Sequence, residues 1–364
     1  MFYITPPLTI ESNMKKKVLF ILKRRDDYSV TKHASHVGLS TGLYNSASFM
    51  NNMLIERGID SGLEVAIDNN CIDRFVNKHK PTHVIIEALW VVPTKFSVLC
   101  KLHPNVTWIV RLHSELPFLA GEGMAMDWIG EYANFSNVLI GVNAPRMMSE
   151  VRSFLQIKNT WTDAQVGNKL VYMPNFYPQE YVTKKFDKNK DWVDIGCFGA
   201  IRPLKNHMVQ AMGALKFANR IGKKLRFHVN AGRIEMQGGP AINNLKATFV
   251  HLYDAGHELI NHEWTPREGF LELCSKMDIG LQVSFSETFN IVGADIISQG
   301  VPLIGSLEIP WKVEYFAADP ADSDDIAEKL YHAYTWPKIN VWTNQMALTA
   351  YTNNTAKIWI KYFK

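Results

Sequence analysis

Short apolar runs alternate with helical patterns along almost the whole of this chain, and this alternation limits the folds that it can adopt. The runs are rich in β-branched and aromatic residues and have no polar side, as is typical of buried parallel strands. Strands and helices that alternate in this way predict a parallel, doubly wound α/β sheet. The expected strands are 18–22, 63–67, 83–87, 106–112, 138–142, 170–173, 193–198, 225–230, 258–262, 278–283 and 301–304. The expected helices include 45–58, 72–78, 94–102, 145–155, 208–221, 241–255, 266–276 and 322–334.

The chain has 364 residues, more than one typical hydrophobic core supports, so two domains are expected. A charged segment with few apolar residues, 183–191, is the best candidate for a linker, because the alternation restarts after it. We therefore expect two Rossmann-like domains, 1–185 and 190–336, that face one another across a cleft. Such a cleft is the default ligand site. The aromatic-rich segment 341–364 is expected to form a last helix that packs back on the N-terminal domain.

Composition is that of an ordinary soluble globular protein, with 47% hydrophobic and 20% charged residues. A net charge of +4 permits a polyanionic partner without requiring one. No apolar run reaches the roughly 18 residues of a membrane span, and the run after Lys15–Lys17 is too short for a signal peptide, so we expect a cytoplasmic protein. The four cysteines have no paired spacing, which predicts reduced thiols and no metal; they are Cys71, Cys100, Cys197 and Cys274.

Two common nucleotide-binding motifs are missing from the sequence. The expected loop after the first strand, 23–44, lacks Gly-x-Gly-x-x-Gly and offers only Gly38 and Gly42, which disfavours a nicotinamide enzyme. No Gly-x-x-x-x-Gly-Lys-Ser/Thr occurs either, which excludes a P-loop nucleotidase.

The stretch 284–305 carries two carboxylates where a ligand is expected. It follows a buried strand and contains a polar turn, a helical pattern closed by Gly300, and a further strand. Glu287 lies at the mouth of the helix and Asp295 eight residues later, about 800° around a helix and so on a neighbouring face. Because ligands bind at the carboxyl edge of open α/β sheets, this stretch is predicted to hold a ligand with hydroxyl and phosphate groups.

A basic motif precedes another helix in the same half of the chain. Arg202 and Lys205 lie three residues apart between the strand 193–198 and the helix 208–221. Two cations beside a helix N-terminus suit a diphosphate, because the helix dipole and the side-chain charges act together. The alternative is a solvated basic loop. The presence of Glu287 to Asn290 in the same half favours the ligand-binding interpretation.

These motifs together resemble the donor half of GT-B glycosyltransferases. The residues concerned are Gly-Ala-Ile-Arg-Pro-Leu-Lys-Asn at 199–206, Ser-Phe-Ser-Glu-Thr-Phe-Asn-Ile-Val-Gly-Ala-Asp at 284–295 and Gly-Val-Pro-Leu-Ile at 300–304. More narrowly, the chain is similar to the retaining enzymes of family 4 and their relatives. Met173-Pro174-Asn175 also resembles that family's end of the N-terminal domain, and His113-Ser114 its strand-end histidine. The resemblance spans 113–305 and is more specific to the fold than to the sugar.

The resemblance implies roles for individual residues and a nucleotide-sugar co-substrate, expected to be a UDP-sugar, with no other cofactor and no metal. Arg202 and Lys205 would hold the donor diphosphate, and Glu287 would contact the donor sugar. Thr288, Phe289 and Asn290 would bind sugar and phosphate, through backbone amides near the last two. The second acid grips the ribose in such enzymes; here it is Asp295 where the family usually has Glu, which puts the nucleotide geometry in question.

The resemblance also implies residues in the N-terminal half. His113 is predicted to face the sugar, the alternative being a strand-end histidine bonded to backbone. Gly42, with Ser40 and Thr41, occupies the place where relatives have a glycine-rich loop that lines the cleft, and an ordinary turn is the alternative. Trp264 follows a strand in the donor half, where a nucleobase could stack, although most tryptophans belong to cores.

The function implied is a glycosyltransferase that moves a sugar from a nucleotide-sugar to an acceptor hydroxyl, with retention of the anomeric configuration. The chain also looks similar to glycosyltransferases carried by large tailed phages, some of which modify hydroxymethylated pyrimidines in DNA. The basic loop after the first strand suits an anionic acceptor, and a solvated loop is the alternative; its cations are Lys23, Arg24, Arg25, Lys32, His33 and His36. The competing functions are transfer to a glycan or lipid, epimerisation of a nucleotide-sugar, and non-catalytic binding of one.

Overall fold

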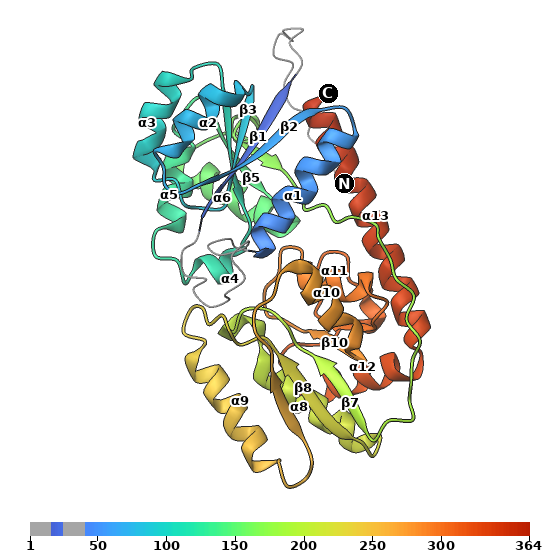
Figure 1. Cartoon of the computed structure of the whole chain (residues 1–364). Coiled ribbons are helices and arrows are strands. Elements are labelled where there is room, and N and C mark those ends of the chain that lie inside the picture. The colour runs from blue at the N-terminus through green and yellow to red at the C-terminus, as the bar shows by residue number, and fades with distance from the viewer. Residues whose placement is uncertain (1–15, 25–40) are drawn as a thin grey trace. The chain divides into compact units, whose positions relative to one another are not determined.

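The computed structural model of the chain describes residues 16–24 and 41–364 (Figure 1). These residues form two compact units. The first is built from residues 16–24, 41–176 and 352–364, and the second from residues 177–351. The chain therefore returns to the first unit within its last helix, α13 (Pro337–Phe363).

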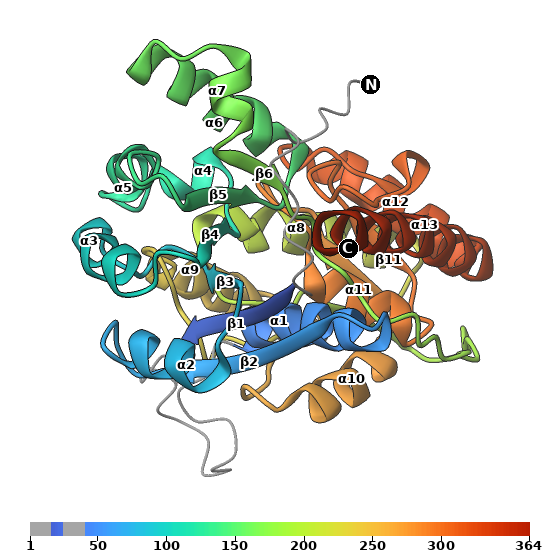
Figure 2. The ribbon, with the colours of Figure 1, turned by 90° about the horizontal axis from the view of Figure 1, so that it is seen from above.

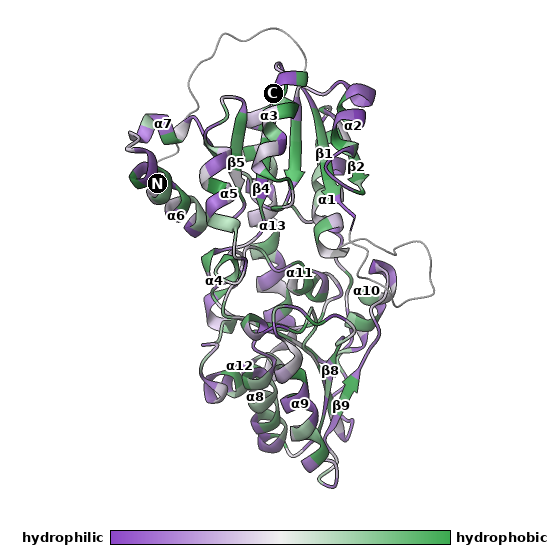
Figure 3. Ribbon diagram, turned by 90° about the vertical axis from the view of Figure 1, so that its left-hand side faces the viewer, coloured by the Kyte–Doolittle hydropathy of each residue, from purple (hydrophilic) through white to green (hydrophobic). Residues whose placement is uncertain are grey.

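The first unit contains a parallel sheet in the order β2-β1-β3-β4-β5-β6, which can be followed in Figure 2. Its central strands are made of continuous apolar runs, coloured as hydrophobic at β1 and β5 in Figure 3. The strands are β1 (Lys17–Lys23), β2 (Asp60–Ala66), β3 (His83–Glu87), β4 (Thr107–Leu112), β5 (Val138–Val142) and β6 (Leu170–Tyr172).

Helices cover both faces of this sheet, because successive side chains of a strand point to opposite faces. Leu19 and Ile21 belong to a core shared with α2 (Cys71–His79), α3 (Pro93–Leu102), α5 (Ala125–Tyr132) and α6 (Pro145–Asn159). Val18, Phe20 and Leu22 belong to a second core, shared with α1 (Thr41–Glu56) and the end of α13. The alternation along β1 thus gives the doubly wound arrangement.

The second unit contains a parallel sheet in the order β11-β10-β7-β8-β9. The strands are β7 (Trp192–Gly196), β8 (Lys224–Val229), β9 (Glu258–Asn261), β10 (Ile279–Gln282) and β11 (Leu303–Gly305). One core packs this sheet against α8 (His207–Arg220), α9 (Gly239–His251) and α12 (Ser323–Thr335). The helices α10 (Arg267–Lys276) and α11 (Ile291–Ser298) complete the unit.

Two glycines permit close packing around α11. A Cβ atom at Gly280 in β10 would lie 2.7 Å from the Ile296 side chain, so the glycine lets α11 approach the sheet. Gly300 has φ +68 and follows the end of α11, where the left-handed region favours glycine. A Cβ there would lie 2.5 Å from the Val182 carbonyl oxygen. The prediction that Gly300 closes this helix is therefore confirmed.

The strand and helix predictions are confirmed at most positions. The strands 83–87 and 138–142 have the predicted bounds. The prediction that a loop extends to Tyr44 is wrong, because α1 begins at Thr41 and Gly42 lies in its first turn. Three short helices were not predicted, since each is too short for a repeating apolar pattern: α4 (Leu116–Leu119), α5 and α7 (Asp163–Gly167).

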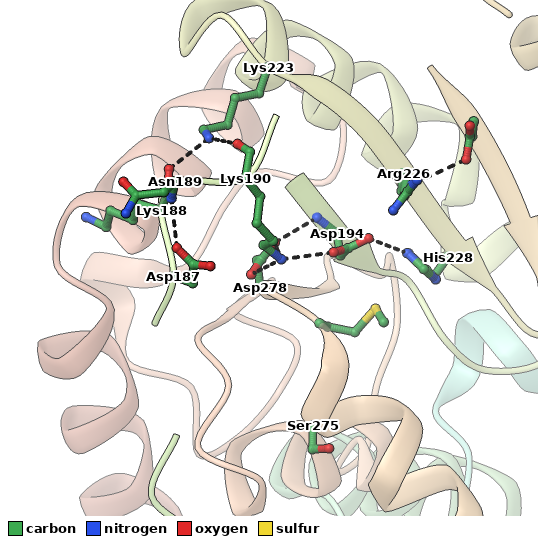
Figure 4. Close-up of polar contacts among 12 residues, drawn as sticks. Asp187, Lys188, Asn189, Lys190, Asp194, Lys223, Arg226, His228, Ser275 and Asp278 are labelled. Atoms are coloured by element: carbon green, nitrogen blue, oxygen red, sulfur yellow. Dashed lines mark hydrogen bonds and ion pairs between the residues drawn. The ribbon is translucent and has the colours of Figure 1, made fainter. Parts of the chain in front are cut away.

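The charged segment 183–191 is not a free linker. Lys190 Nζ lies 2.7 Å from Asp278 Oδ2 and 3.0 Å from Asp194 Oδ2, and Lys223 Nζ donates to the Lys188 carbonyl at 2.9 Å (Figure 4). Upstream, Val182 N donates to the Ser298 carbonyl at 2.7 Å. These contacts place the segment on the second unit. The change of unit falls before it, between residues 176 and 177.

Asp194 continues this network across the second sheet. Its Oδ1 lies 3.1 Å from His228 Nε2, and His228 Nδ1 lies 2.8 Å from His262 Nε2. The two imidazole rings stack with centroids 5.1 Å apart. Lys190 of the segment 183–191 is therefore linked through Asp194 to the two histidines on β8 and after β9.

Candidate functional site

The second sheet has a topological switch point between β7 and β10. From β7 the chain proceeds outward to β8 and β9 on one side, and then returns to β10 on the other. In open α/β sheets, ligands bind outside the carboxyl ends of the strands at such a point. The two predicted donor motifs, 199–206 and 284–295, begin within three residues of the ends of these two strands.

The loop after β7 is held in place from within the fold. Arg202 precedes a turn of 3-10 helix, Pro203–Lys205, and Asn206 then adopts a left-handed conformation with φ 60. Asn206 Nδ2 donates to the Val283 carbonyl at 3.1 Å and to the Pro320 carbonyl at 2.6 Å. Gln210 in α8 donates to the Lys205 carbonyl at 2.7 Å and accepts from Val283 N at 2.8 Å. These contacts fix the β7 loop against the β10 loop.

Lys205 and Glu287 form an ion pair where the two loops meet. Only 11% of the Lys205 side chain and 7% of the Glu287 side chain are exposed. Burial lowers the pKa of the Lys205 ammonium, Glu287 opposes that shift, and Arg202 adds to it. The structure thus brings together three residues that the sequence placed in one site.

The loop after β8 adds charged groups that the sequence analysis did not select. Arg202 Nη1 lies 3.5 Å from Glu235 Oε2, and Arg233 forms a second ion pair with Glu235. The Arg233 guanidinium lies 5.7 Å from the ring centroid of Trp264. Three cations in these loops face two carboxylates, so the loops keep one net positive charge.

His207, the first residue of α8, contributes no charge to this group. It is 2% exposed, and burial, together with Lys205 and Arg202, lowers its pKa to about 3. The positive charge beside the α8 N-terminus therefore comes from Arg202 and Lys205.

The residues after Glu287 form a rigid turn. Asn290 is left-handed, with φ 63, and its Oδ1 accepts from Gly293 N at 2.7 Å as the cap of α11. Its Nδ2 donates to Gln282 Oε1 at 2.9 Å. Phe289 is buried, and its carbonyl accepts from Trp311 Nε1 at 2.7 Å. Thr288 lies in the same turn.

The helical estimate of the angle between Glu287 and Asp295 is wrong. The helix begins at Ile291, because the left-handed Asn290 interrupts it, so Glu287 lies in the preceding turn. Asp295 is 3% exposed and forms an ion pair with Arg267. Its Oδ1 also accepts from the Tyr177 hydroxyl at 2.7 Å. The ribose-binding role of Asp295 stays a prediction.

The predicted residues of the N-terminal half lie in the first unit. His113 directly follows β4 and is hydrogen-bonded to Glu87, the last residue of β3. Glu115 forms an ion pair with Arg146. Gly42 lies in the first turn of α1. Ser40 and most of the basic loop, Arg25, Lys32, His33 and His36, lie outside the described residues.

Several residues that pair with the predicted site residues were not predicted from the sequence. A charged residue within an apolar run could have indicated two of them. Glu87 and Arg111 are charged residues inside apolar runs, at positions expected to be fully buried. Buried charges are rare unless they are paired, so one acid and one base on neighbouring strands should have suggested a pair. Glu235, Tyr177 and Arg267 carry no comparable pattern.

The structure also shows a side-chain cap at the start of α12. Asp322 Oδ1 accepts from Asp324 N at 2.8 Å and from Asp325 N at 3.2 Å, so Asp322 caps this helix. All four cysteines are free thiols. Within the described ranges, no group of three or more His, Cys, Asp or Glu side chains is arranged to hold a metal ion. No helix in the same ranges has the length and apolar character needed to cross a membrane.

No protein-family model and no curated protein matches the chain. Solved structures do resemble it. Sucrose-phosphate synthase from Thermosynechococcus elongatus has a TM-score of 0.65 at 10% identity, over 96% of this chain and 98% of that chain. A UDP-forming trehalose-phosphate synthase from Burkholderia xenovorans has a TM-score of 0.64 at 12% identity, over 95% of this chain and 98% of that chain. S. aureus TarM, in a complex that contains UDP, has a TM-score of 0.58 at 11% identity, over 80% of this chain and 58% of that chain.

These similarities extend over both units of the chain, and at such low identity they concern the fold. Each unit has a parallel sheet with the Rossmann-like alternation predicted from the sequence. The chain therefore has the two-domain GT-B fold that is found in glycosyltransferases.

Proposed function

We propose that this protein is a glycosyltransferase that moves a sugar from a nucleotide-sugar to a hydroxyl group of an acceptor. One observation carries the proposal: Arg202, Lys205 and Glu287 converge at the switch point of the second sheet. Two cations and a carboxylate at that edge suit a sugar diphosphate, whose phosphates need positive charge and whose hydroxyls need acceptors.

The chemistry follows from the leaving group. As the bond between the sugar and the diphosphate breaks, negative charge grows on the phosphate and positive charge on the sugar ring. Arg202 and Lys205, beside the N-terminus of α8, stabilise the negative charge on the phosphate. This arrangement needs no metal. We further propose retention of configuration, in which the leaving phosphate accepts the proton of the acceptor on the same face of the sugar.

The remaining predicted residues have supporting roles in the proposal. Glu287 contacts the donor sugar, and the turn at Thr288, Phe289 and Asn290 binds sugar and phosphate. Asp295 binds the ribose, through a geometry set by its contacts with Arg267 and Tyr177. In the first unit, His113 faces the sugar, and Gly42 offers backbone groups in the first turn of α1.

UDP is the proposed nucleotide, and the acceptor is proposed to be a hydroxymethylated pyrimidine in DNA. UDP is supported by the structures of TarM and of the pneumococcal transferase GtfA, both of which were solved with UDP. The DNA acceptor is supported by the phage resemblance and the net charge of +4. Such an enzyme would have to turn the base out of its stack.

The first experiment is a donor screen with the full chain. The protein is incubated with UDP-, GDP-, ADP- and dTDP-sugars, and release of the nucleoside diphosphate is measured. A glycosyltransferase is expected to hydrolyse its own donor slowly even without an acceptor. An epimerase would instead return an isomeric nucleotide-sugar, and a pure binding protein would bind a donor without turnover.

The Glu287→Ala variant tests the site. We expect loss of transfer with UDP binding retained, because the diphosphate contacts come from Arg202 and Lys205. The matched control is Glu272→Ala, which removes an exposed carboxylate of α10 that pairs with Lys276 on the surface. Full activity in Glu287→Ala would refute the assignment of the site.

The acceptor is tested separately. DNA that contains hydroxymethylcytosine is incubated with each donor, digested to nucleosides and analysed by mass spectrometry. A hexose or pentose adduct on the modified base is expected with one donor. If no common donor gives a mass shift, the DNA acceptor is wrong, and a glycan or lipid acceptor becomes the next one to assay.

A further inference from the structure

The loop between β8 and α9, residues 230–238, places a carboxylate beside one of the two cations that are proposed to hold the diphosphate. Glu235 Oε2 lies 3.5 Å from Arg202 Nη1, and Glu235 also forms an ion pair with Arg233. A negative side chain at this position repels an anionic ligand and shares its cation. Glu235 has no part in the proposed donor chemistry, yet it must affect the affinity of the site for phosphate.

The backbone fixes Glu235 next to Arg202. Ile201 N donates to the Arg233 carbonyl at 2.9 Å, and the Ile201 carbonyl accepts from Glu235 N at 2.9 Å. These bonds form a parallel bridge between Ile201 and Ile234. Because successive side chains of an extended segment point to opposite sides, Arg233 and Glu235 lie on the same side of this bridge as Arg202. The contact between Glu235 and Arg202 therefore follows from backbone register.

The turn after Glu235 is strained. Met236 has φ 45 and Gln237 has φ 63, so two successive residues other than glycine are left-handed. Gly238 N donates to the Glu235 carbonyl at 2.8 Å, and a Cβ atom at Gly238 would overlap the Ile201 carbonyl oxygen. Backbone strain of this kind is typical of ligand-binding loops, and it persists only where the surrounding contacts enforce it. The loop thus holds its carboxylate in a defined place.

Arg202 can leave Glu235 at little cost. In this ion pair 21% of the Arg202 side chain and 19% of the Glu235 side chain are exposed, and a pair that water reaches contributes little stability. A diphosphate carries more charge and can bind a guanidinium through two oxygens at once. When Arg202 turns to the diphosphate, Arg233 remains paired with Glu235, so this carboxylate keeps a cationic partner.

We propose that Glu235 competes with the donor diphosphate for Arg202. It occupies the guanidinium in the empty protein and gives it up when the diphosphate binds. The affinity for a nucleoside diphosphate is therefore lower than Arg202 and Lys205 alone would give. The identity of the ligand as a nucleotide-sugar rests on the proposed function, whereas the competition applies to any diphosphate that reaches Arg202.

The proposal is tested by calorimetric titration of the full chain with UDP, inorganic pyrophosphate and uridine. Glu235→Gln keeps the shape of the side chain and removes its charge. It should bind UDP and pyrophosphate about threefold to tenfold more tightly than the unmodified protein, the range of one partly exposed ion pair. Uridine, which has no phosphate, should show no difference. Equal or weaker binding of UDP and pyrophosphate by a folded Glu235→Gln protein would overturn the proposal, as would an equal gain for uridine.

Glu258→Gln is the matched control. Glu258 of β9 lies 3.3 Å from Arg226 in the same unit, so this variant removes the same charge from a different ion pair. Its UDP affinity should equal that of the unmodified protein, and a gain equal to that of Glu235→Gln would show that net charge, not competition for Arg202, is responsible.

A crystal structure of the unmodified protein with UDP is the second test, and it decides if Glu235→Gln does not fold. Arg202 should contact a phosphate and lie apart from Glu235. An Arg202–Glu235 contact that persists beside bound UDP would refute the competition.

The competition and the proposed function fail in different ways. If pyrophosphate binds more tightly to Glu235→Gln but no nucleotide-sugar is turned over, the proposed function fails and the competition stands. If a donor is turned over but both proteins bind UDP equally, the glycosyltransferase stands and Glu235 does not compete for Arg202.

Discussion

Lys205 shows how one residue can prepare a site for an anion. Its ammonium is almost buried and has Glu287 as its ion-pair partner, while burial and Arg202 weaken its hold on the proton. A buried cation with a single carboxylate partner gains from a second negative group, because its lost hydration is only partly replaced. A diphosphate bound beside Arg202 would supply that group.

Lys205→Met should weaken UDP binding about 10- to 100-fold, the effect of one charge-assisted hydrogen bond lost from the complex. Isothermal titration calorimetry measures the affinity. Lys216→Met is the matched control, since Lys216 pairs with Asp324 at 2.7 Å on the surface of the same unit. Equal UDP affinities for Lys205→Met and the unmodified protein would remove Lys205 from the site.

At the scale of the element, α13 is fixed to the first unit by its last turns. The His83 ring of β3 lies edge-on to Phe363, with centroids 5.3 Å apart, and to Tyr362, at 6.2 Å. Lys16 Nζ donates to the Tyr362 carbonyl at 2.9 Å. Burial and the nearby Lys16 lower the pKa of His83 from 6.5 to about 4. We therefore expect the docking of α13 to be sensitive to acid.

The sign of this pH effect follows from the two pKa values of His83. Below pH 6.5 the unfolded chain binds a proton that the folded chain does not take up until about pH 4. The stability contributed by a neutral His83 is thus present above pH 6.5 and is lost as the pH falls through this window, by up to about 3 kcal/mol. Hydrogen exchange in 352–364 should speed up over the same range.

His83→Phe should remove most of this pH dependence, because phenylalanine keeps the ring contacts and cannot take a proton. His251→Phe, on the exposed surface of α9, is the control and should leave the exchange of 352–364 unchanged. A His83→Phe protein with the original pH profile would show that another group controls the docking of α13.

At the scale of the whole molecule, each unit has its own sheet and core, so the two should respond separately to mutation. Trp359 of α13 is 1% exposed in the first unit, stacks on Phe20 with centroids 5.9 Å apart and donates to the Pro174 carbonyl at 2.9 Å. Trp342 of the same helix belongs to the second unit and is 60% exposed.

Trp359→Ala should destabilise the first unit by about 3–5 kcal/mol, the usual cost of removing a buried tryptophan. Trp342→Ala should change stability by less than about 1 kcal/mol. Hydrogen exchange with mass spectrometry at increasing urea measures each unit separately through its own peptides. An equal loss of protection in 177–335 of Trp359→Ala would show that the units unfold as one.

The alternation of apolar runs and helices was enough to predict both sheets, because strands buried on both faces must be apolar throughout. The strand 83–87 has the predicted bounds around its apolar run 84–86. The ends of helices and the turns were predicted less accurately than the strands. The start of α11, for example, depends on the left-handed Asn290, which no apolar pattern reveals. The helices α4, α5 and α7 were missed because each is too short to show a repeating apolar pattern.

The sequence by itself determined the fold class and the two loops that carry Arg202, Lys205 and Glu287, since these depend on local pattern and on strand ends. Only the tertiary structure decided the partners of each charge: Lys205 with Glu287, Asp295 with Arg267, and Glu87 with Arg111 and His113. The reason is physical. Local patterns fix where a strand or helix lies, but a buried charge is neutralised by residues far away in the chain, and the order of strands in the sheet selects them.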